Sequence, residues 1–578
     1  MAVRKERLGR PYIATKDILQ CFVLNFLFSL SSASNFSCYV EPGYNYDSLW
    51  NTTALRLCKS LDGKPRPEKV CIVGGGSSGT HLGWLLKRRG WNPVLFERNG
   101  RLGGEIWTRY RLPSDDGGDN VTRELGAAFL SPDYDEVRAL LARYNQTEVA
   151  ISSIDEMQFH VHSPDDEPNP VETTSSRAER VVTPQVWAEH WVSRITGSDN
   201  VTANNELVDE ALKKYYTLHE SIFGPMGRNR FPTEPETDEQ LEAIHGSSLS
   251  FLVRHGLDIL QPLMYQFFVL QGMGRLDTMP AYYMLKWCNP VSMQQGGFGD
   301  ASHPLAMLPE GYGSLIDGLA AEVNLDVRLN ATVVSVDRSA LPSGTDDSGQ
   351  IKLKVRYSEG PEEEEICDML ALSGPITEFV RGSNDGSRAA ILNPPTDDEV
   401  SLFASKQPMQ FLIQLLDLEP GNPVQEQFEA LEFWPANFQT TGGVIVRRDV
   451  SYAEENGGEG PLNGTTKWPH TIGGLQSYSY WPAPRSDESR HLAAQELWLK
   501  QHNLTVRETL ARVFFDTYLF HFGNKDIMER KPWRLAPLQQ PFAGSRTIYV
   551  GGTASFETVE DSLQSTLELI HDLFDSRD

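Results

Sequence analysis

Residues 69–100 read KVCIVGGGSSGTHLGWLLKRRGWNPVLFERNG, and this stretch decides the fold of the 578-residue chain. The apolar run at residues 70–73 predicts a short buried strand. Leucines at helical spacing follow the glycines, and residues 93–97 begin a second strand. Strand, tight turn, helix and strand together predict one βαβ unit.

The turn of this unit carries the pattern Gly74-x-Gly76-x-x-Gly79, and the second strand ends at Glu97. The first glycine permits a tight turn, the second lets backbone amides approach a pyrophosphate, and the third lets helix pack on strand. The helix N-terminus adds the positive end of its dipole. A carboxylate at Glu97 would accept hydrogen bonds from ribose hydroxyls and repel a 2′-phosphate. The pattern therefore favours FAD or NAD over NADP.

The first 34 residues have the layout of a secretory signal. A basic segment precedes the apolar run from Ile18 to Leu30, and small residues end at Ser34. The run is too short for a membrane anchor. Asn-x-Ser/Thr sequons, the acceptor sites of N-glycosylation, follow at Asn35, Asn51, Asn120, Asn145, Asn200, Asn330, Asn463 and Asn503. We therefore expect a secreted or secretory-pathway glycoprotein with no membrane attachment after signal cleavage.

Charge and cysteine usage narrow the possible partners. The formal net charge of −26 argues against nucleic acid or an anionic membrane, because binding phosphates requires a basic surface. Cys38 and Cys58 bracket a short loop and could pair in an oxidising compartment, whereas Cys71 and Cys367 lie in apolar runs that predict buried strands. No CxxC pair is present, so a structural zinc site is not expected.

Four further motifs distinguish FAD from NAD. They are RLGG at 101–104, ELGAAFL at 124–130, GYGSLIDGLA at 311–320 and IYVGGTASFETVEDSLQS at 548–565. Their order and spacing resemble the flavin-containing amine oxidase superfamily over most of residues 69–578. The C-terminal motif is the most informative, since an NAD-binding domain does not need a distant segment that returns to the same site.

The resemblance implies a cofactor site for FAD. Gly74, Gly76, Ser78 and Gly79 would hold the pyrophosphate, Glu97 the adenosine ribose, and Arg101, Gly103 and Gly104 the pyrophosphate and ribityl side. Gly126 and Ala127 would lie near the flavin, Val333 would meet the adenine through its backbone, and Gly552, Thr553 and Val559 would hold the ribityl phosphate and pyrimidine. The helix beginning near Val559 would direct its N-terminus at the flavin.

The chain also departs from the superfamily pattern. Asn99 and Glu105 stand where arginine is usual, and Thr553 stands where an acid is common. No cysteine follows Cys367, so covalent attachment through cysteine is not expected and the FAD should be non-covalent. The signal and LSPDYDEV at 130–137 resemble the broader branch that includes the fungal beta-cyclopiazonate dehydrogenase.

These observations predict an α/β protein in which a Rossmann-like FAD-binding domain, built from discontinuous segments, is interleaved with an α+β substrate domain. The expected boundaries are signal peptide 1–34, lead-in 35–68, FAD-binding parts 69–150, 306–384 and 541–578, and substrate-domain parts 151–305 and 385–540. The first substrate segment should contain a helical insertion. The run Glu362 to Glu365 is expected at the solvated tip of a hairpin.

The function expected from sequence is oxidation of a small, apolar metabolite at a C–H or C–N bond by hydride transfer to flavin. Two alternatives remain: a redox-neutral isomerase of an unsaturated lipid, and a flavin-binding protein without turnover. Candidate pocket segments are YQFFVLQGMG at 265–274, YYMLKWC at 282–288 and YSYWP at 478–482, with Lys286 and Tyr480 as candidate proton handlers. His160 and His162 have no third ligand at metal spacing, and no metal is expected.

Overall fold

The computed structural model describes the chain in segments that begin at Lys69. They are residues 69–109, 122–150, 158–161, 180–182, 184–225, 231, 233–269, 271–295, 306–339, 350–358, 360–382, 389–419, 430–433, 443–448, 471–479, 487–531, 533, 535, 538–541 and 544–575. The signal segment, Cys38, Cys58, His162, Tyr480 and the sequons at Asn35, Asn51, Asn120 and Asn463 lie outside them.

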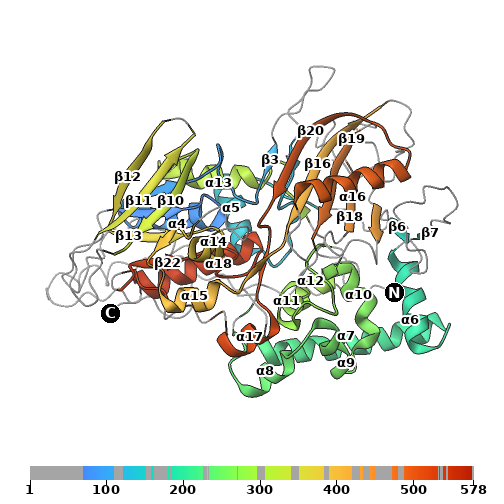
Figure 1. The fold of residues 1–578 in the computed structure, drawn as a ribbon. Helices are drawn as coiled ribbons and strands as arrows, with labels where there is room; N and C mark the ends of the chain where they lie inside the picture. The colour runs from blue at the N-terminus through green and yellow to red at the C-terminus, as the bar shows by residue number, and fades with distance from the viewer. Residues whose placement is uncertain are drawn as a thin grey trace, which may run out of the picture.

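A five-stranded parallel sheet forms the centre of one half of the molecule (Figure 1). Its order is β22 (Thr547–Tyr549), β13 (Met369–Leu372), β1 (Val70–Val73), β2 (Pro93–Phe96) and β9 (Asp326–Arg328). The strands come from three distant parts of the sequence, and β1 pairs in parallel with both β13 and β2. All four residues of β1 are buried, as expected for a strand covered on both faces.

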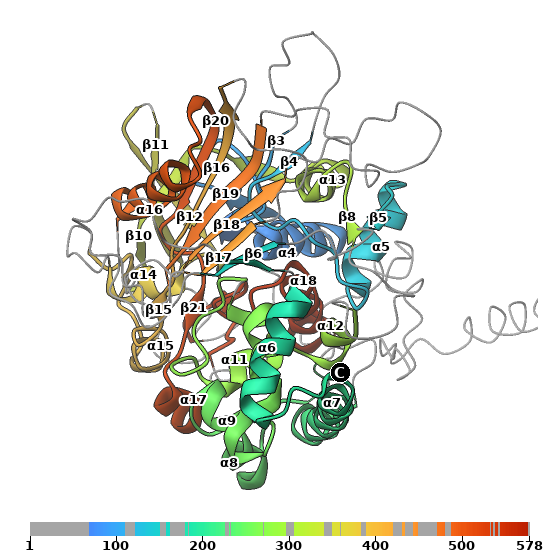
Figure 2. The same cartoon turned by 90° about the vertical axis from the view of Figure 1, so that its right-hand side faces the viewer.

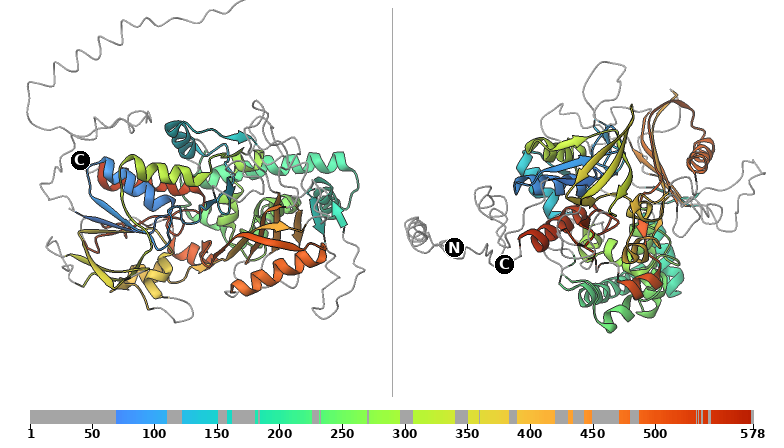
Figure 3. Two further views of the ribbon diagram at one scale, coloured as in Figure 1. Left: turned by 90° about the horizontal axis from the view of Figure 1, so that it is seen from above. Right: turned by 60° about the vertical axis from the view of Figure 1, so that its left-hand side comes forward.

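The two faces of this sheet are covered differently. Alternate residues such as Ile72 and Leu95 join a core with the helices α4 (Ser77–Arg88), α5 (Asp135–Tyr144), α13 (Tyr312–Glu322) and α18 (Val559–Ile570). The helices α4, α13 and α18 run side by side (Figure 3). Cys71 and Val73 join the core on the other face. That core includes residues of a second sheet, with order β12 (Glu362–Cys367), β11 (Ile351–Tyr357), β10 (Ala331–Asp337) and β14 (Leu392–Asn393).

The glutamate run at 362–365 was wrongly predicted to be a hairpin tip. These residues belong to strand β12, and Glu362 and Glu364 lie opposite Arg356 and Lys354 of β11. Opposite charges directly across an antiparallel pair stabilise the pairing. The run therefore forms part of a strand of the hairpin and not its turn, because β11 has basic side chains at alternate positions.

The other half contains a seven-stranded sheet and a group of helices (Figures 1 and 2). The sheet order is β20 (Val506–Phe515), β16 (Phe411–Leu418), β19 (Thr471–Tyr478), β18 (Gly443–Arg448), β17 (Ala430–Phe433), β6 (Gln158–Val161) and β7 (Arg180–Val182), with α16 (Glu488–Gln501) packed on it. The helices are α6 (Pro184–Thr196), α7 (Val201–Phe223), α8 (Asp238–Ile244), α9 (Ser248–Arg254), α10 (Gln261–Met264), α11 (Ala281–Trp287), α12 (Pro290–Gln295) and α17 (Asn524–Arg530). The predicted helical insertion corresponds to α6 through α10.

The remaining elements are short. They are β3 (Thr108–Arg109), β4 (Arg123–Glu124), β5 (Val149–Ala150), β8 (Ala306–Met307), α14 (Ile376–Arg381), α15 (Asp397–Phe403), β15 (Gln407–Pro408) and β21 (Phe520–His521). Within the described segments, no helix has both the length and the apolar character needed to cross a bilayer.

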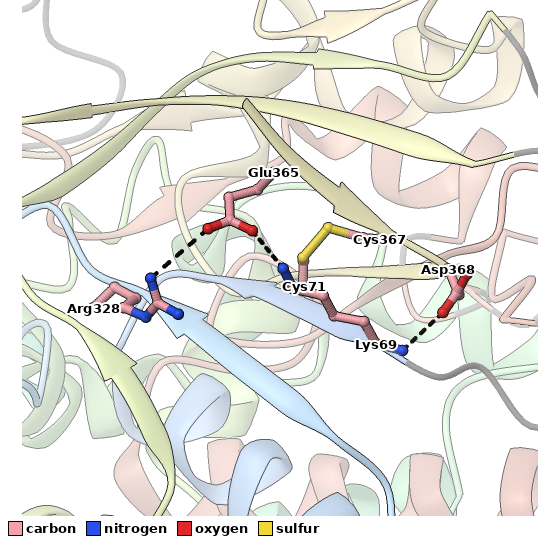
Figure 4. The surroundings of a disulfide bond; sticks show 6 residues. All are labelled: Lys69, Cys71, Arg328, Glu365, Cys367 and Asp368. Atoms are coloured by element: carbon pink, nitrogen blue, oxygen red, sulfur yellow. Dashed lines mark hydrogen bonds and ion pairs between the residues drawn. A yellow bond between two sulfur atoms is a disulfide. The ribbon is translucent and has the colours of Figure 1, made fainter. Parts of the chain in front are cut away.

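A disulfide between Cys71 and Cys367 fastens β1 to the end of β12 (Figure 4). Both cysteines are fully buried, as their apolar surroundings predicted, but their pairing was not predicted. Lys69, beside the bridge, donates its backbone amide to Asp368 and pairs its ammonium with Glu365. The bridge therefore closes a loop of 296 residues at the strand that leads into the glycine turn.

The double substitution Cys71→Ala/Cys367→Ala should lower the free energy of unfolding by roughly 2–5 kcal/mol, because the unfolded chain regains the freedom that a long closed loop removes. Urea unfolding followed by far-UV circular dichroism measures this loss. Cys288→Ala, which removes a buried free thiol but no bridge, should cost only about 1 kcal/mol. Equal losses in the two variants would contradict a stabilising role for the bridge.

Candidate functional site

One cavity of about 630 Å³ runs from the glycine turn to the seven-stranded sheet. Its walls come from both halves of the molecule: β1, β2 and the loop before α18 on one side, and α11, β19 and β20 on the other. Segments that are hundreds of residues apart thus line one cavity. We take this cavity as the candidate site.

The N-terminus of α4 forms one end of the cavity. Gly76 is its N-cap residue, and no side chain caps the helix there, so the first amides of the helix remain available to an anion. A Cβ on Gly74 would lie 2.0 Å from the Ser373 carbonyl oxygen, and one on Gly79 would lie 2.0 Å from the Gly74 carbonyl oxygen. Glycine is therefore required for the close approach of turn, helix and β13.

Glu97 lies at the end of β2 and is 4% exposed. Its carboxylate accepts the Gly75 amide at 2.7 Å and both the amide and Nδ2 of Asn99 at 2.8 Å. A carboxylate has about four acceptor positions, so capacity remains for a ribose hydroxyl in the cavity that Glu97 lines. Asn99, which departs from the superfamily pattern, holds this acid in place.

Arg101 braces the loop that follows. Its guanidinium donates to the carbonyl oxygens of Leu102, Gly104 and Ile106 at 2.6–2.9 Å and stacks on Trp107. Burial lowers its pKa to about 10, partly offset by Glu97. The structure therefore places Arg101 against its own loop as well as in the cavity wall, where it fixes Gly103 and Gly104 beside Gly76.

The returning C-terminal segment forms the far wall. Thr558 caps α18 by accepting the Asp561 amide, and Val559 begins the helix. Thr553 is held through its carbonyl oxygen by the Lys406 ammonium at 2.8 Å. This segment lies next to β1 because β22 pairs with β13 in the central sheet.

The structure brings the predicted cofactor residues together. Gly74, Gly76, Ser78, Glu97, Arg101, Gly103, Gly104, Gly126, Ala127, Val333, Gly552, Thr553 and Val559 all line the cavity. Gly79 lies behind it, against Gly74 and Ser373. The cradle of glycines, the open helix N-terminus and the buried acid fit a dinucleotide such as FAD, whose binding by these residues stays a prediction.

The aromatic segments divide between the cavity and the core. Phe267, Trp287 and Tyr478 line the cavity, while Phe268 and Tyr282 are buried core residues. Lys286 does not face the cavity, because its ammonium pairs with Glu234 and lies over Phe231. We therefore do not retain Lys286 as a proton handler. Across the described segments, no cluster of three or more acidic, histidine or cysteine side chains could hold a metal ion.

Sequence reasoning missed a buried group of ionisable residues at the cavity. Glu557 lines it with a side chain that is 5% exposed, and Oε1 of this residue lies 3.5 Å from His521 Nε2. Lys406 is 3% exposed and acts electrostatically on Glu557. A signal was present in the sequence: Glu557 is an acid that directly follows the uncharged stretch GGTASF at 551–556, just before a helix.

The comparisons with known proteins agree with this architecture. The sequence model of the flavin-containing amine oxidoreductase family matches residues 79–374, which is half of the chain. The chain belongs to this family. It is 21% identical over 541 residues to the polyenoic fatty acid isomerase of Ptilota filicina, covering 88% of this chain and 95% of that protein.

Solved structures of similar proteins share the fold. A CLA-producing fatty acid isomerase from P. acnes superposes with a TM-score of 0.61 at 16% identity, covering 87% of this chain and 98% of the other. Cyclohexylamine oxidase from Brevibacterium oxydans superposes with a TM-score of 0.51 at 13% identity, covering 88% and 100%. At these identities the likeness concerns the fold alone, and the family implies a flavin cofactor.

Glu97→Gln should weaken FAD binding roughly tenfold or more, because a charge-assisted hydrogen bond to ribose becomes a neutral one. Titration of the apoprotein with FAD, followed by quenching of flavin fluorescence, measures the dissociation constant. Glu364→Gln removes an exposed carboxylate on β12 that does not line the cavity, and should leave the affinity unchanged. Unchanged affinity in Glu97→Gln would argue against its contact with the cofactor.

Proposed function

We propose that this protein is an FAD-dependent oxidoreductase that oxidises a small, apolar metabolite at a C–H or C–N bond. The observation that carries the proposal is that one cavity contains both the dinucleotide fingerprint and an aromatic chamber. Phe129, Phe267, Trp287, Phe515 and Tyr518 all line this chamber. An apolar chamber with few polar groups is typical of a small-molecule substrate site.

The chain's residues would hold the cofactor without a covalent bond. The first amides of α4 would receive the pyrophosphate, Glu97 the ribose, and the N-terminal end of α18 the flavin, where its dipole favours negative charge. When bound, FAD supplies the acceptor for a hydride. None of the described cysteines lines the cavity, which supports non-covalent binding. We also propose that the chain belongs to the branch that includes the fungal beta-cyclopiazonate dehydrogenase.

A second candidate is a redox-neutral isomerase of an unsaturated lipid, in which hydride leaves the substrate and returns to it. Two similar proteins named as fatty acid isomerases, one by sequence and one by structure, favour it. Putrescine oxidase and cyclohexylamine oxidase superpose as well, with TM-scores of 0.52 and 0.51. The fold therefore accommodates both reaction types, and the reaction has to be decided by experiment.

Flavin-loaded protein should be mixed under anaerobic conditions with linoleic acid, putrescine or cyclohexylamine. Oxidation predicts bleaching of the visible flavin absorbance by a substrate and its recovery in air. Isomerisation predicts a conjugated diene from linoleic acid with no net bleaching and no need for oxygen. Protein that loads FAD but does neither with any compound of a wider panel of amines and unsaturated lipids would support the third alternative, flavin binding without turnover.

We also propose that the chain enters the secretory pathway. The buried Cys71–Cys367 disulfide supports an oxidising compartment. The sequon asparagines Asn145, Asn200, Asn330 and Asn503 are all exposed. Three of them have positive φ, and Asn200 caps α7, so they lie at chain reversals where a glycan has room.

Expression in a secretory eukaryotic host should give protein that moves to lower apparent mass after treatment with peptide N-glycosidase F. Peptide mass spectrometry should then find the deamidated asparagine at these exposed sequons. Asn289 is fully buried and has no sequon, so it serves as an internal control that should stay unmodified. Secreted protein without any glycan would refute the glycoprotein part of this proposal.

A further inference from the structure

Glu557 lies at the cavity with a carboxyl group that is only partly satisfied. Its Oε2 atom is buried and has no hydrogen-bond partner among the described residues, while Oε1 faces His521. A buried carboxyl oxygen without a partner costs free energy of folding. Glu557 is also part of the cavity wall, which brings this incompletely satisfied carboxyl group to the edge of the cavity.

We propose that Glu557 is the catalytic base of the cavity, and that Lys406 and His521 are positioning residues that keep its carboxylate charged and oriented. The proposal rests on the proposed function, because only a net oxidation releases a proton that a base must receive. FAD would accept the hydride, and Glu557 would accept the proton.

Three elements build the environment of Glu557. Lys406 lies between α15 and β15 and is anchored by its bond to the Thr553 carbonyl and by the Phe522 ring at 4.5 Å. His521 lies on β21, with its ring edge-on to Tyr283 at 4.3 Å between ring centroids. The lysine therefore cannot move away without losing a buried hydrogen bond, which holds its ammonium where it acts electrostatically on Glu557.

The charges around Glu557 favour a proton that can be gained and lost near neutral pH. Burial raises the pKa of Glu557 to about 8 and Asp561 adds to this, while the Lys406 ammonium opposes the rise. Burial likewise lowers the pKa of Lys406 to about 8 against the attraction of Glu557. Burial lowers the pKa of His521 to about 3, helped by Lys406, so its ring is neutral.

Glu105 is another carboxyl-bearing residue that lines the cavity. Burial raises the pKa of Glu105 well above its usual range, and repulsion from Glu557 adds to the rise. Glu557 is assigned as the base because its carboxyl group approaches His521 and has a buried oxygen without a partner among the described residues.

The step balances in atoms and electrons. A substrate C–H or N–H bond breaks, its proton goes to the Glu557 carboxylate to form the carboxylic acid, and its electron pair forms the new C=C or C=N bond. The hydride lost from the neighbouring carbon is the one that bound FAD accepts. Release of the proton to solvent restores the carboxylate beside Lys406.

The pH dependence of kcat/KM tests the assignment on the substrate that bleaches the flavin. In the unaltered holoenzyme the plot of kcat/KM against pH should show a rising limb with its midpoint near pH 8, because the base acts in its deprotonated form. Glu557→Gln should lose this limb and fall about 10²–10⁴-fold. Glu557→Asp should restore part of the rate. Lys406→Met removes the stabilising cation and should move the limb to higher pH, and Lys406→Arg should move it back.

A second measurement needs no substrate. Infrared spectra of the resting holoprotein between pH 6 and pH 10 should show a buried carboxylic-acid carbonyl band that disappears near pH 8. The band should be absent in Glu557→Gln. Glu105→Gln, which imitates the protonated form of the matched carboxyl, should keep both this band and the position of the kinetic limb.

The outcomes separate the two proposals. A kinetic limb that survives in Glu557→Gln, or is lost only in Glu105→Gln, overturns the assignment while leaving the oxidation intact. A carbonyl band that titrates as expected in protein that oxidises no compound overturns the proposed function, and the catalytic role of Glu557 with it. Loss of limb and band in Glu557→Gln alone, with FAD content unchanged, supports the assignment.

Discussion

The structure depends on a backbone contact at the carboxyl end of the central sheet. Gly74 leaves β1 against the Ser373 carbonyl at the end of β13, and Gly79 of α4 packs on both, at distances where any Cβ would collide. Parallel strands place their carboxyl ends at one edge, so this contact also fixes where the loops before α4 and α18 meet. The strand β22 pairs in parallel with β13, so the loop that follows β22 also reaches this edge of the sheet and completes the cavity wall. The Cys71–Cys367 bridge ties β1, the strand that leads into Gly74, to the end of β12.

Local patterns in the sequence predicted the elements that make this contact. The βαβ unit, α13 and the strand–turn–helix at the C-terminus all appear as expected, because their apolar spacing and glycines act within about 30 residues. Of the predicted cofactor residues, Gly74, Gly76 and Glu97 could be placed from the βαβ pattern, whereas residues such as Val333 and Val559 were expected there from the family resemblance. Glu97 is an instance, since its position after β2 was sufficient to place it.

Features that require distant partners could not be predicted in this way. Cys71 and Cys367 are 296 residues apart, and only the pairing of β1 with β13 brings them together. The glutamates at 362–365 form a strand because basic residues face them across the hairpin, and a charge run alone does not show its partner. Lys286 was misplaced because its partner, Glu234, lies 52 residues earlier and directs the ammonium away from the cavity.

The ionisable group around Glu557 gives the clearest physical distinction between the two reaction types. Lys406, His521 and Glu557 come from three separate segments of the chain, and each is nearly inaccessible to water. Burying such ionisable groups lowers the stability of the fold. A redox-neutral isomerisation moves a hydride out and back and needs no acceptor for a proton. An oxidation must put a proton somewhere at each turnover, and a carboxylate poised beside a cation in the cavity wall meets that need. Under the proposal that Glu557 is the base, an oxidation would use these buried groups, whereas the fold by itself is shared by oxidases and a fatty acid isomerase.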